Sequence, residues 1–205
     1  MPKDIIKSLS MDFAMDITNT PAVMFGDFVL KSGIKSNYFI NFGNLCNGRD
    51  IKMIGEYFAF YIFTGINKKF PAPDVIFGPA YKGINIAIST SIALVSKYNI
   101  NIPFAYNRKV EKGHGEHGRF VGYDLNKAKT ALIVDDVITN GGTKYEVINM
   151  LSQFKNLSVV GMVVGVDRQE TNEEGKDYIS IFKDKTGVDI YSLTNKENIF
   201  KFNKT

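Results

Sequence analysis

Residues 132–143, LIVDDVITNGGT, combine acids, hydroxyls and glycines in an order that could bind a phosphorylated sugar. An apolar run ends in Asp135 and Asp136, a short turn follows, and a helix is expected directly after Thr143. Glycines let backbone N–H groups approach a phosphate closely, and the N-terminus of a helix adds positive potential. Paired acids would repel that anion unless they hold sugar hydroxyls, or a metal ion bound to a diphosphate. We therefore interpret this stretch as a cradle for a sugar phosphate rather than as a strand capped by aspartates.

The same acids could belong to a nucleotide-hydrolysing P-loop protein. That class needs G-x-x-x-x-G-K-[ST] elsewhere in the chain. The nearest candidate spans Gly78 to Gly83, but Ile84 and Asn85 follow where a lysine and a hydroxyl residue are required. The sequence therefore excludes the P-loop ATPase class.

A second unusual stretch, NRKVEKGHGEHGRFVG at residues 107–122, concentrates basic residues, glycines and both histidines of the chain. Almost nothing in it is suited to a core. Its glycines predict a mobile backbone, and its cations predict contact with an anion. His114 and His117 lack a third ligand at usable spacing, so we do not expect a zinc site. The stretch therefore predicts a basic, mobile loop.

The surrounding elements predict an α/β fold. Four apolar runs, at residues 74–78, 101–107, 130–136 and 157–167, have the length and composition of buried strands. Because helical patterns mostly join them, they indicate a Rossmann-like parallel sheet flanked by helices, whose ligands bind at the carboxyl ends of the strands. Further elements are expected as helices at 3–18, 49–64, 84–98, 144–154 and 178–186, a hairpin at 23–42 and a short strand at 188–193.

Length and composition limit the class of protein. We expect the 205 residues to form one domain, with N-terminal hood elements at about 1–70 and a ligand-binding core at about 71–195. No apolar run approaches the roughly 18–20 residues of a membrane span, and the N-terminus has no signal-peptide core. The single cysteine, Cys46, excludes an internal disulfide and favours the cytoplasm. A net charge of +4 without a long basic tract favours anionic small molecules over nucleic acid.

The apolar strand, the Asp-Asp pair and T-x-G-G-T together resemble the ribose-phosphate signature of the phosphoribosyltransferases, which use phosphoribosyl diphosphate (PRPP). FVLKSGIKSNYFIN, FGPAYKGI, NRKVEKGHGEHG and DRQE occur in the same order, and at similar spacing, as in orotate phosphoribosyltransferases. The resemblance extends from about residue 10 to residue 195. It implies a type I phosphoribosyltransferase fold. It also implies transfer of the phosphoribosyl group from PRPP to N1 of orotate, giving orotidine 5′-monophosphate and diphosphate in pyrimidine (UMP) biosynthesis.

The resemblance also implies roles for individual residues. Asp135 and Asp136 would hold the ribose hydroxyls and help position Mg²⁺ carried by the diphosphate, with no dedicated protein site for the metal. Together with Lys112 they are the expected catalytic residues. Tyr81 and Lys82 would line the diphosphate side, where the flanking glycines favour a ligand contact over an ordinary surface loop. The residues expected to bind PRPP are Lys31, Tyr81, Lys82, Arg108, Lys109, Lys112, His114, Asp135, Asp136, Val137, Ile138, Thr139, Asn140, Gly141, Gly142 and Thr143.

Orotate is a flat anion that needs a surface for its ring and a cation for its carboxylate. Phe39 and Ile40 match ring-contact positions of the family, although an aromatic residue in a strand is more often part of a core. Arg168 suits the carboxylate because its planar fork pairs with two oxygens at once. The residues expected to bind orotate are Lys31, Phe39, Ile40, Thr139 and Arg168.

The basic loop, residues 108–119, then has an expected function. Its residues Arg108, Lys109, Lys112 and His114 match basic positions that contact diphosphate in the family. Closure of a mobile loop would exclude water from a reactive sugar cation. The 12 residues extend to about 35–40 Å at most, which is enough to reach a neighbouring subunit. The resemblance implies a homodimer in which this loop completes the site of the partner.

Two alternatives remain open at this stage. A regulator that keeps the fold as a PRPP sensor and binds nucleic acid would need a recognition surface, and the sequence has neither an appended helix-turn-helix domain nor a basic aromatic platform. A phosphoribosyltransferase for a different base would share the same cradle. Orotate-dependent release of diphosphate, compared with uracil, adenine and hypoxanthine, would separate these alternatives.

Overall fold

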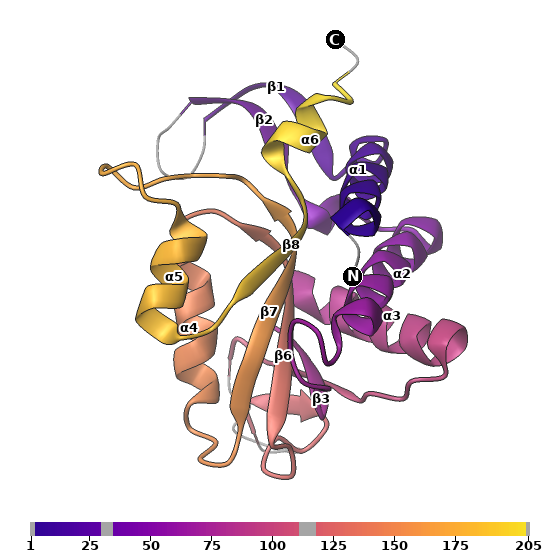
Figure 1. Cartoon of the computed structure of the whole chain (residues 1–205), viewed down its shortest axis with the longest axis vertical. Coiled ribbons are helices and arrows are strands. Elements are labelled where there is room, and N and C mark those ends of the chain that lie inside the picture. Colours follow the sequence, from indigo (N-terminus) through magenta and orange to yellow (C-terminus); the bar gives the residue numbers. More distant parts are fainter. Residues whose placement is uncertain (1–2, 30–34, 111–117, 204–205) are drawn as a thin grey trace.

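A computed structural model of the chain describes residues 3–29, 35–110 and 118–203, with side chains from residue 7 onward. The described elements form one main sheet with helices and a separate two-stranded hairpin (Figure 1). The strands are β1 (Val23–Val29), β2 (Lys35–Ile40), β3 (Val75–Gly78), β4 (Phe104–Asn107), β5 (Phe120–Gly122), β6 (Thr130–Ile138), β7 (Ser158–Asp167) and β8 (Ile190–Asn195). The helices are α1 (Lys3–Thr18), α2 (Gly48–Gly65), α3 (Lys82–Tyr98), α4 (Gly142–Leu151), α5 (Tyr178–Thr186) and α6 (Lys196–Phe200), with a 3₁₀ turn η1 (Phe42–Asn44).

The main sheet has the strand order β5-β4-β3-β6-β7-β8. Strands β4, β3, β6, β7 and β8 run parallel, whereas the edge strand β5 runs antiparallel to β4. The central strands are almost continuously apolar, and all four residues of β3 are buried. Such runs are typical of parallel strands that are covered on both faces. The expected Rossmann-like sheet flanked by helices is therefore confirmed.

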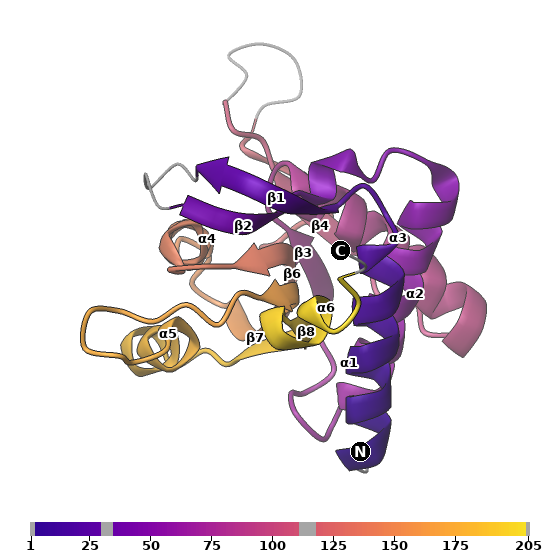
Figure 2. The same cartoon turned by 90° about the horizontal axis from the view of Figure 1, so that it is seen from above.

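Two groups of helices cover the two faces of the sheet (Figure 2). Helices α4 and α5 lie on one face, whose core includes Ile133 and Phe182. Helices α1, α2 and α3 lie on the other face, whose core includes Phe13, Phe58 and Leu132. Neighbouring residues of β6 enter opposite cores because side chains alternate along a strand. None of the described helices is long and apolar enough to cross a membrane.

The β1–β2 hairpin forms its own antiparallel sheet at the end of the main sheet where β6 and β7 finish (Figure 1). Helices α1 and α2 do not form a separate lobe, because Phe13 and Phe58 are fully buried in the same core as Leu132 of β6. Within residues 3–29 and 35–70, the hairpin is therefore the part that stands over the sheet as a cover.

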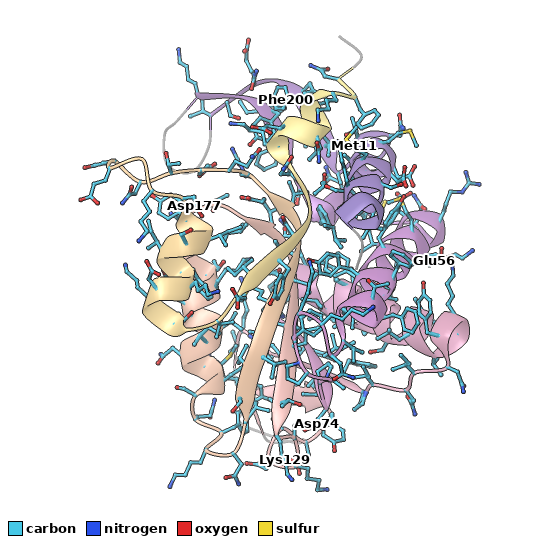
Figure 3. All side chains as sticks on the ribbon, viewed as in Figure 1. Met11, Glu56, Asp74, Lys129, Asp177 and Phe200 are labelled. Carbon is cyan, nitrogen blue, oxygen red and sulfur yellow. The ribbon has the colours of Figure 1, made fainter. Side chains whose placement is uncertain are left out.

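Labelled side chains locate the two ends of the sheet in Figure 3. Asp74 and Lys129 lie at the end where β3 and β6 begin, and the backbone N–H of Lys129 donates to the Asp74 carboxylate over 2.7 Å. Asp177 and Phe200 lie toward the opposite end, on the side of the hairpin. The loops that sequence analysis expects to bind ligand follow strands at this second end.

Several element boundaries differ from the sequence expectations. Strand β6 continues to Ile138 instead of ending at residue 136, because the two following residues still pair with β7. Strand β4 begins at Phe104 rather than at residue 101, after Pro103, which has no N–H to donate to a ladder. Helix α4 begins two residues early and ends at Leu151, and β8 ends at Asn195.

Two short elements, β5 and α6, are not predicted from the sequence. Strand β5 lies inside residues 107–122, the stretch expected to avoid the core, yet the ring centroid of Phe120 lies 6.2 Å from that of Phe77 and 5.0 Å from that of Phe154. Its pairing with β4 closes the base of the basic loop.

Helix α6 follows Asn195, whose side chain caps it by accepting a backbone hydrogen bond. Elements this short carry no periodic apolar pattern, so sequence analysis misses them.

Candidate functional site

A cleft of about 1430 Å³ lies between the β1–β2 hairpin and the carboxyl ends of β6 and β7. Ligands of open parallel sheets usually bind at this end of the strands. The hairpin, the turn after β6 and the segment after β7 each contribute a wall. The lining residues are Asp27, Phe28, Val29, Lys35, Ser36, Asn37, Tyr38, Phe39, Ile40, Lys82, Asp136, Val137, Thr139, Asn140, Arg168, Gln169, Glu170, Thr171, Tyr178 and Lys196.

The structure brings together only part of the predicted site. Three predicted residues, Lys31, Lys112 and His114, lie outside the described residues. Those that line the cleft are Phe39, Ile40, Lys82, Asp136, Val137, Thr139, Asn140 and Arg168. Those that are described but do not line it are Tyr81, Arg108, Lys109, Asp135, Ile138, Gly141, Gly142 and Thr143.

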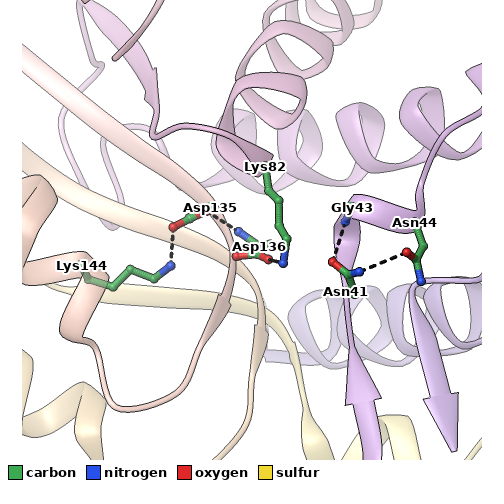
Figure 4. Close-up of polar contacts among 7 residues, drawn as sticks. All are labelled: Asn41, Gly43, Asn44, Lys82, Asp135, Asp136 and Lys144. Carbon is green, nitrogen blue, oxygen red and sulfur yellow. Dashed lines mark hydrogen bonds and ion pairs between the residues drawn. The ribbon is translucent and has the colours of Figure 1, made fainter. Parts of the chain in front are cut away.

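The two acids at the end of β6 point in different directions (Figure 4). Asp136 lines the cleft, and its Oδ2 lies 2.9 Å from Nζ of Lys82 on α3. Asp135 is buried on the other side of the strand and forms an ion pair with Lys144 of α4. Burial raises the pKa of Asp135, and the Lys144 ammonium opposes this shift. Of the pair, Asp136 therefore faces the ligand cleft in this structure, and a direct ligand contact of Asp135 stays a prediction.

The T-x-G-G-T turn joins β6 to α4 directly beside the cleft. Gly141 adopts φ 78°, a left-handed conformation that favours glycine. The Asn140 side chain accepts a hydrogen bond from the N–H of Gly142 over 3.1 Å. Thr139 and Asn140 line the cleft, and the N-terminus of α4 follows at once, so its positive potential suits a phosphate at this turn. Ile138, in contrast, buries its side chain in the core under α4.

The loop after β3 brings Tyr81 and Lys82 toward the acids. A Cβ atom on Gly78 would lie 2.1 Å from the carbonyl oxygen of Gly83, so the close approach of α3 to the end of β3 requires glycine there. This approach places the start of α3 within reach of Asp136. Tyr81 is 67% exposed and borders, with Lys82, a second cavity of about 120 Å³ rather than the main cleft.

The described ends of the basic loop form a closed stem next to Tyr81. The backbone N–H of Arg108 donates to the carbonyl oxygen of Arg119 over 2.7 Å. The side-chain Nη1 of Arg108 donates to the carbonyl oxygen of Gly118 over 2.9 Å. Nζ of Lys109 lies 5.1 Å from the ring centroid of Tyr81. The stem therefore joins the basic loop to the segment that carries Tyr81 and Lys82, at the border of the cleft.

Arg168, directly after β7, also lines the cleft. It is 7% exposed, and its Nε donates to the hydroxyl of Tyr38 over 3.0 Å. The same Nε lies 3.0 Å from Oε1 of Glu170. Burial raises the pKa of Tyr38 above its ordinary value of 10.0, although the positive charge of Arg168 acts in the opposite direction. The phenol is therefore neutral at physiological pH. This corner of the cleft offers a held cation to an anionic ligand.

Phe39 and Ile40 line the cleft from strand β2. Phe39 is half-buried, and its ring centroid lies 5.7 Å from that of Phe28. Ile40 is only 6% exposed and belongs to the core shared with α1 and α2. Phe39 therefore offers an aromatic surface for a flat ring, whereas most of the Ile40 side chain is used in core packing.

Comparison with known proteins identifies the family. The phosphoribosyl transferase domain matches residues 47–195. The orotate phosphoribosyltransferase of Bifidobacterium longum is 39% identical over 197 residues, covering 95% of this chain and 85% of its own length. That of Clostridium beijerinckii is 33% identical over 197 residues, covering 96% and 87%. The chain belongs to the orotate phosphoribosyltransferase family.

A solved structure supports the same assignment. The orotate phosphoribosyltransferase of Francisella tularensis superimposes with a TM-score of 0.75 at 34% identity, covering 95% of this chain and 89% of its own. As a member of the orotate phosphoribosyltransferases, the chain is an enzyme of the pentosyltransferase class. The resemblance found in the sequence motifs is therefore confirmed.

Two residues of this orotate phosphoribosyltransferase site are not predicted from the sequence. Tyr38 contacts Arg168 across 130 positions of the chain, a separation that no local motif encodes. Lys144 is only 3% exposed although it stands in the first turn of α4, where the helix dipole disfavours a cation. The ion pair could have been suspected from the sequence, because Lys144 directly follows the T-x-G-G-T turn, nine positions after Asp135.

The donor atoms of the cleft fit a metal ion that arrives with a ligand. Among the described residues, no group of three or more His, Cys, Asp or Glu side chains could hold a metal ion. Asp136 presents a carboxylate beside the phosphate turn, and carboxylate oxygens suit Mg²⁺. Mg²⁺ keeps several waters and takes substrate phosphates as ligands, so one such carboxylate is a sufficient protein contribution.

Proposed function

We propose that this enzyme transfers the 5-phosphoribosyl group of PRPP to N1 of orotate in a Mg²⁺-dependent reaction of de novo pyrimidine synthesis. The C1–O bond to diphosphate breaks, the C1–N1 bond forms, and the proton of N1 is released. The products are orotidine 5′-monophosphate and diphosphate. The observation that carries the proposal is that Asp136 and Arg168 line one cleft, because the reaction needs a group for the sugar hydroxyls and a cation for the orotate carboxylate.

The sugar side of the cleft suits PRPP. Thr139, Asn140 and the N-terminus of α4 would bind the 5′-phosphate through hydroxyl and backbone donors. Asp136 would accept hydrogen bonds from ribose hydroxyls, and Lys82 would then turn from Asp136 to the departing diphosphate. Bound Mg²⁺ would neutralise part of the charge that grows on this leaving group.

The base side of the cleft suits orotate. Phe39 would lie against the flat ring, and the guanidinium of Arg168 would pair with the carboxylate through two parallel hydrogen bonds. Thr139 also lines the cleft and would contact orotate as well as PRPP. A base without a carboxylate would leave the buried charge of Arg168 without this partner, which disfavours other bases.

The basic loop would complete the site from a second subunit of a homodimer. Lys112 and His114 would approach the diphosphate, and closure would keep water from the sugar cation. The stem formed by Arg108 and Arg119 lies next to Tyr81, the chain neighbour of the cleft residue Lys82, and this position supports the proposal. We place the enzyme in the cytoplasm because a chain with one cysteine, the exposed Cys46, suits a reducing compartment.

A catalytic assay tests the reaction. Purified enzyme is incubated with PRPP, Mg²⁺ and one base from orotate, uracil, adenine or hypoxanthine, and diphosphate release is measured. We expect release with orotate and its loss on chelation with EDTA. Release with another base but not with orotate would reject the substrate assignment, and DNA or RNA binding without turnover would favour the regulator.

Mixed dimers test the shared loop. Lys112→Ala and Asp136→Asn should each remove most of the turnover. An equal mixture of the two variants is unfolded and refolded, so that about half of the dimers contain one subunit of each variant. If the loop serves the neighbouring subunit, each mixed dimer has one intact site of two, and about a quarter of the wild-type activity should return. If mixed dimers are shown to form but no activity returns, the loop serves its own subunit.

A further inference from the structure

The side chain of Arg168, which directly follows β7, is held by one group from β2 and one from the loop after β7. Its Nε donates to the hydroxyl of Tyr38 on β2 over 3.0 Å, and its guanidinium carbon lies 4.8 Å from the centroid of the Tyr38 ring. Glu170 Oε1 lies 3.0 Å from the same Nε. One phenol therefore contacts the arginine both through its hydroxyl and through its ring face, which constrains the plane of the guanidinium.

This arrangement leaves the terminal nitrogens of Arg168 for a ligand. Within the described part of the chain, no hydrogen bond engages Nη1 or Nη2, and the contact with Glu170 is at Nε. Arg168 lines the cleft although its side chain is only 9% exposed. An arginine that has Nε anchored and both terminal nitrogens available is suited to pairing with a planar carboxylate.

Tyr38 is itself firmly supported. It is 5% exposed, and the edge of its ring meets Phe200 of α6 at 5.2 Å between centroids and an interplanar angle of 79°. Phe200 also meets Phe25 of β1 at 5.5 Å. Residues from the hairpin and from the last helix thus fix the phenol. A fixed phenol loses little side-chain entropy when it holds the arginine.

We propose that Tyr38 is a positioning residue that orients the guanidinium of Arg168 toward the carboxylate of the pyrimidine and so contributes to the selection of a carboxylated base. The inference rests on the proposed function, because it takes orotate as the base. Glu170 is the other group on Nε, but its side chain is 35% exposed, so solvent competes for its contact. Glu170 balances the charge of Arg168, whereas Tyr38 determines its direction.

The test uses two nucleotides that differ only by the carboxylate, orotidine 5′-monophosphate and uridine 5′-monophosphate. Their dissociation constants are measured by calorimetry for the wild type and for Tyr38→Phe, which keeps the ring and removes the hydroxyl. We expect the preference for orotidine 5′-monophosphate to fall about tenfold, because the lost hydrogen bond involves a charged group. Uridine 5′-monophosphate should bind nearly as before, and the KM for orotate should rise more than kcat falls.

Tyr57→Phe is the matched control. The Tyr57 hydroxyl also donates a short side-chain hydrogen bond, to Asp16 over 2.6 Å, but between α1 and α2 and away from the cleft lining. It should leave the preference between the two nucleotides unchanged. An equal weakening of both nucleotides by Tyr38→Phe, or no change in either, would overturn the role of Tyr38. A wild type that binds uridine 5′-monophosphate as tightly as orotidine 5′-monophosphate would instead overturn the choice of orotate, and this inference with it.

Discussion

The ammonium of Lys144 and the carboxylate of Asp135 form a buried ion pair that joins the first turn of α4 to the end of β6 (Figure 4). The second carboxylate oxygen, Oδ1 of Asp135, accepts a hydrogen bond from the N–H of Asp136 over 2.9 Å. The same carboxylate therefore holds both the helix that carries the phosphate turn and the peptide that carries the cleft-facing acid.

Replacing Lys144 with methionine should destabilise the fold strongly. The change leaves the Asp135 carboxylate buried without its cation, and breaking such a pair costs about 3–5 kcal/mol. Urea denaturation measures the free energy of unfolding. Lys176→Met is the control and should cost much less, because the Lys176–Asp184 pair is exposed to solvent. Asp135→Asn in the Lys144→Met background should recover part of the loss, and equal losses in the two lysine variants would contradict the buried pair.

Asp136→Asn should impair PRPP use with little effect on folding. The substitution keeps the shape of the side chain but removes the charge that faces the cleft, so we expect kcat/KM for PRPP to fall about 100-fold. Steady-state kinetics at varied PRPP measures this. Asp184→Asn, on the exposed surface of α5, is the control and should keep wild-type kinetics. Normal PRPP titration of Asp136→Asn would remove this residue from the proposed site.

Gly78→Ala should disturb the site through the backbone. The new Cβ would lie 2.1 Å from the carbonyl oxygen of Gly83, so the loop with Tyr81 and Lys82 must shift. Overpacking of this kind costs about 1–3 kcal/mol, and we expect a higher KM for PRPP as well. Gly48→Ala, at the start of α2, meets no atom within 4 Å and should change stability by less than about 1 kcal/mol. Thermal denaturation measures the stability of both variants, and steady-state kinetics measures their KM for PRPP. Equal values for the two variants would contradict the close approach of α3 to β3.

Asp177→Ala should reveal a pH-dependent helix cap. The Asp177 carboxylate accepts the N–H of Ser180 over 2.8 Å, and this bond holds the pKa of Asp177 below its ordinary value of 3.8. A lowered folded-state pKa means that the stabilisation is complete well above 3.8 and is lost as pH falls through the folded-state value. Asp177→Ala should therefore cost about 1 kcal/mol at pH 7 and less in acid.

Asp177→Asn is the matched variant for this cap, because asparagine caps helices equally well without a titrating group. Its free energy of unfolding, measured by denaturation from pH 7 to acid, should differ little from that of the wild type at pH 7. A difference between Asp177→Ala and the wild type that stays constant down to acid pH would argue against the charged cap.

The sequence predicts the sheet well because buried parallel strands are long apolar runs, as in β6 and β7. It predicts the turn from Thr139 to Thr143 because glycines and hydroxyl residues at consecutive positions before a helix form a local pattern. It misses β5 and α6, since elements of three and five residues form by pairing and capping rather than by periodicity.

What the sequence determined by itself is therefore local: the α/β pattern, the acid-glycine turn and the family. Only the tertiary structure decided which acid meets the cleft, because the two acids point to opposite faces of β6 and helix α4, which carries Lys144, covers the face of Asp135. It likewise decided that Tyr38 holds Arg168, a contact between residues 130 positions apart. The direction of a side chain depends on partners that folding brings together, and those partners are not neighbours in the chain.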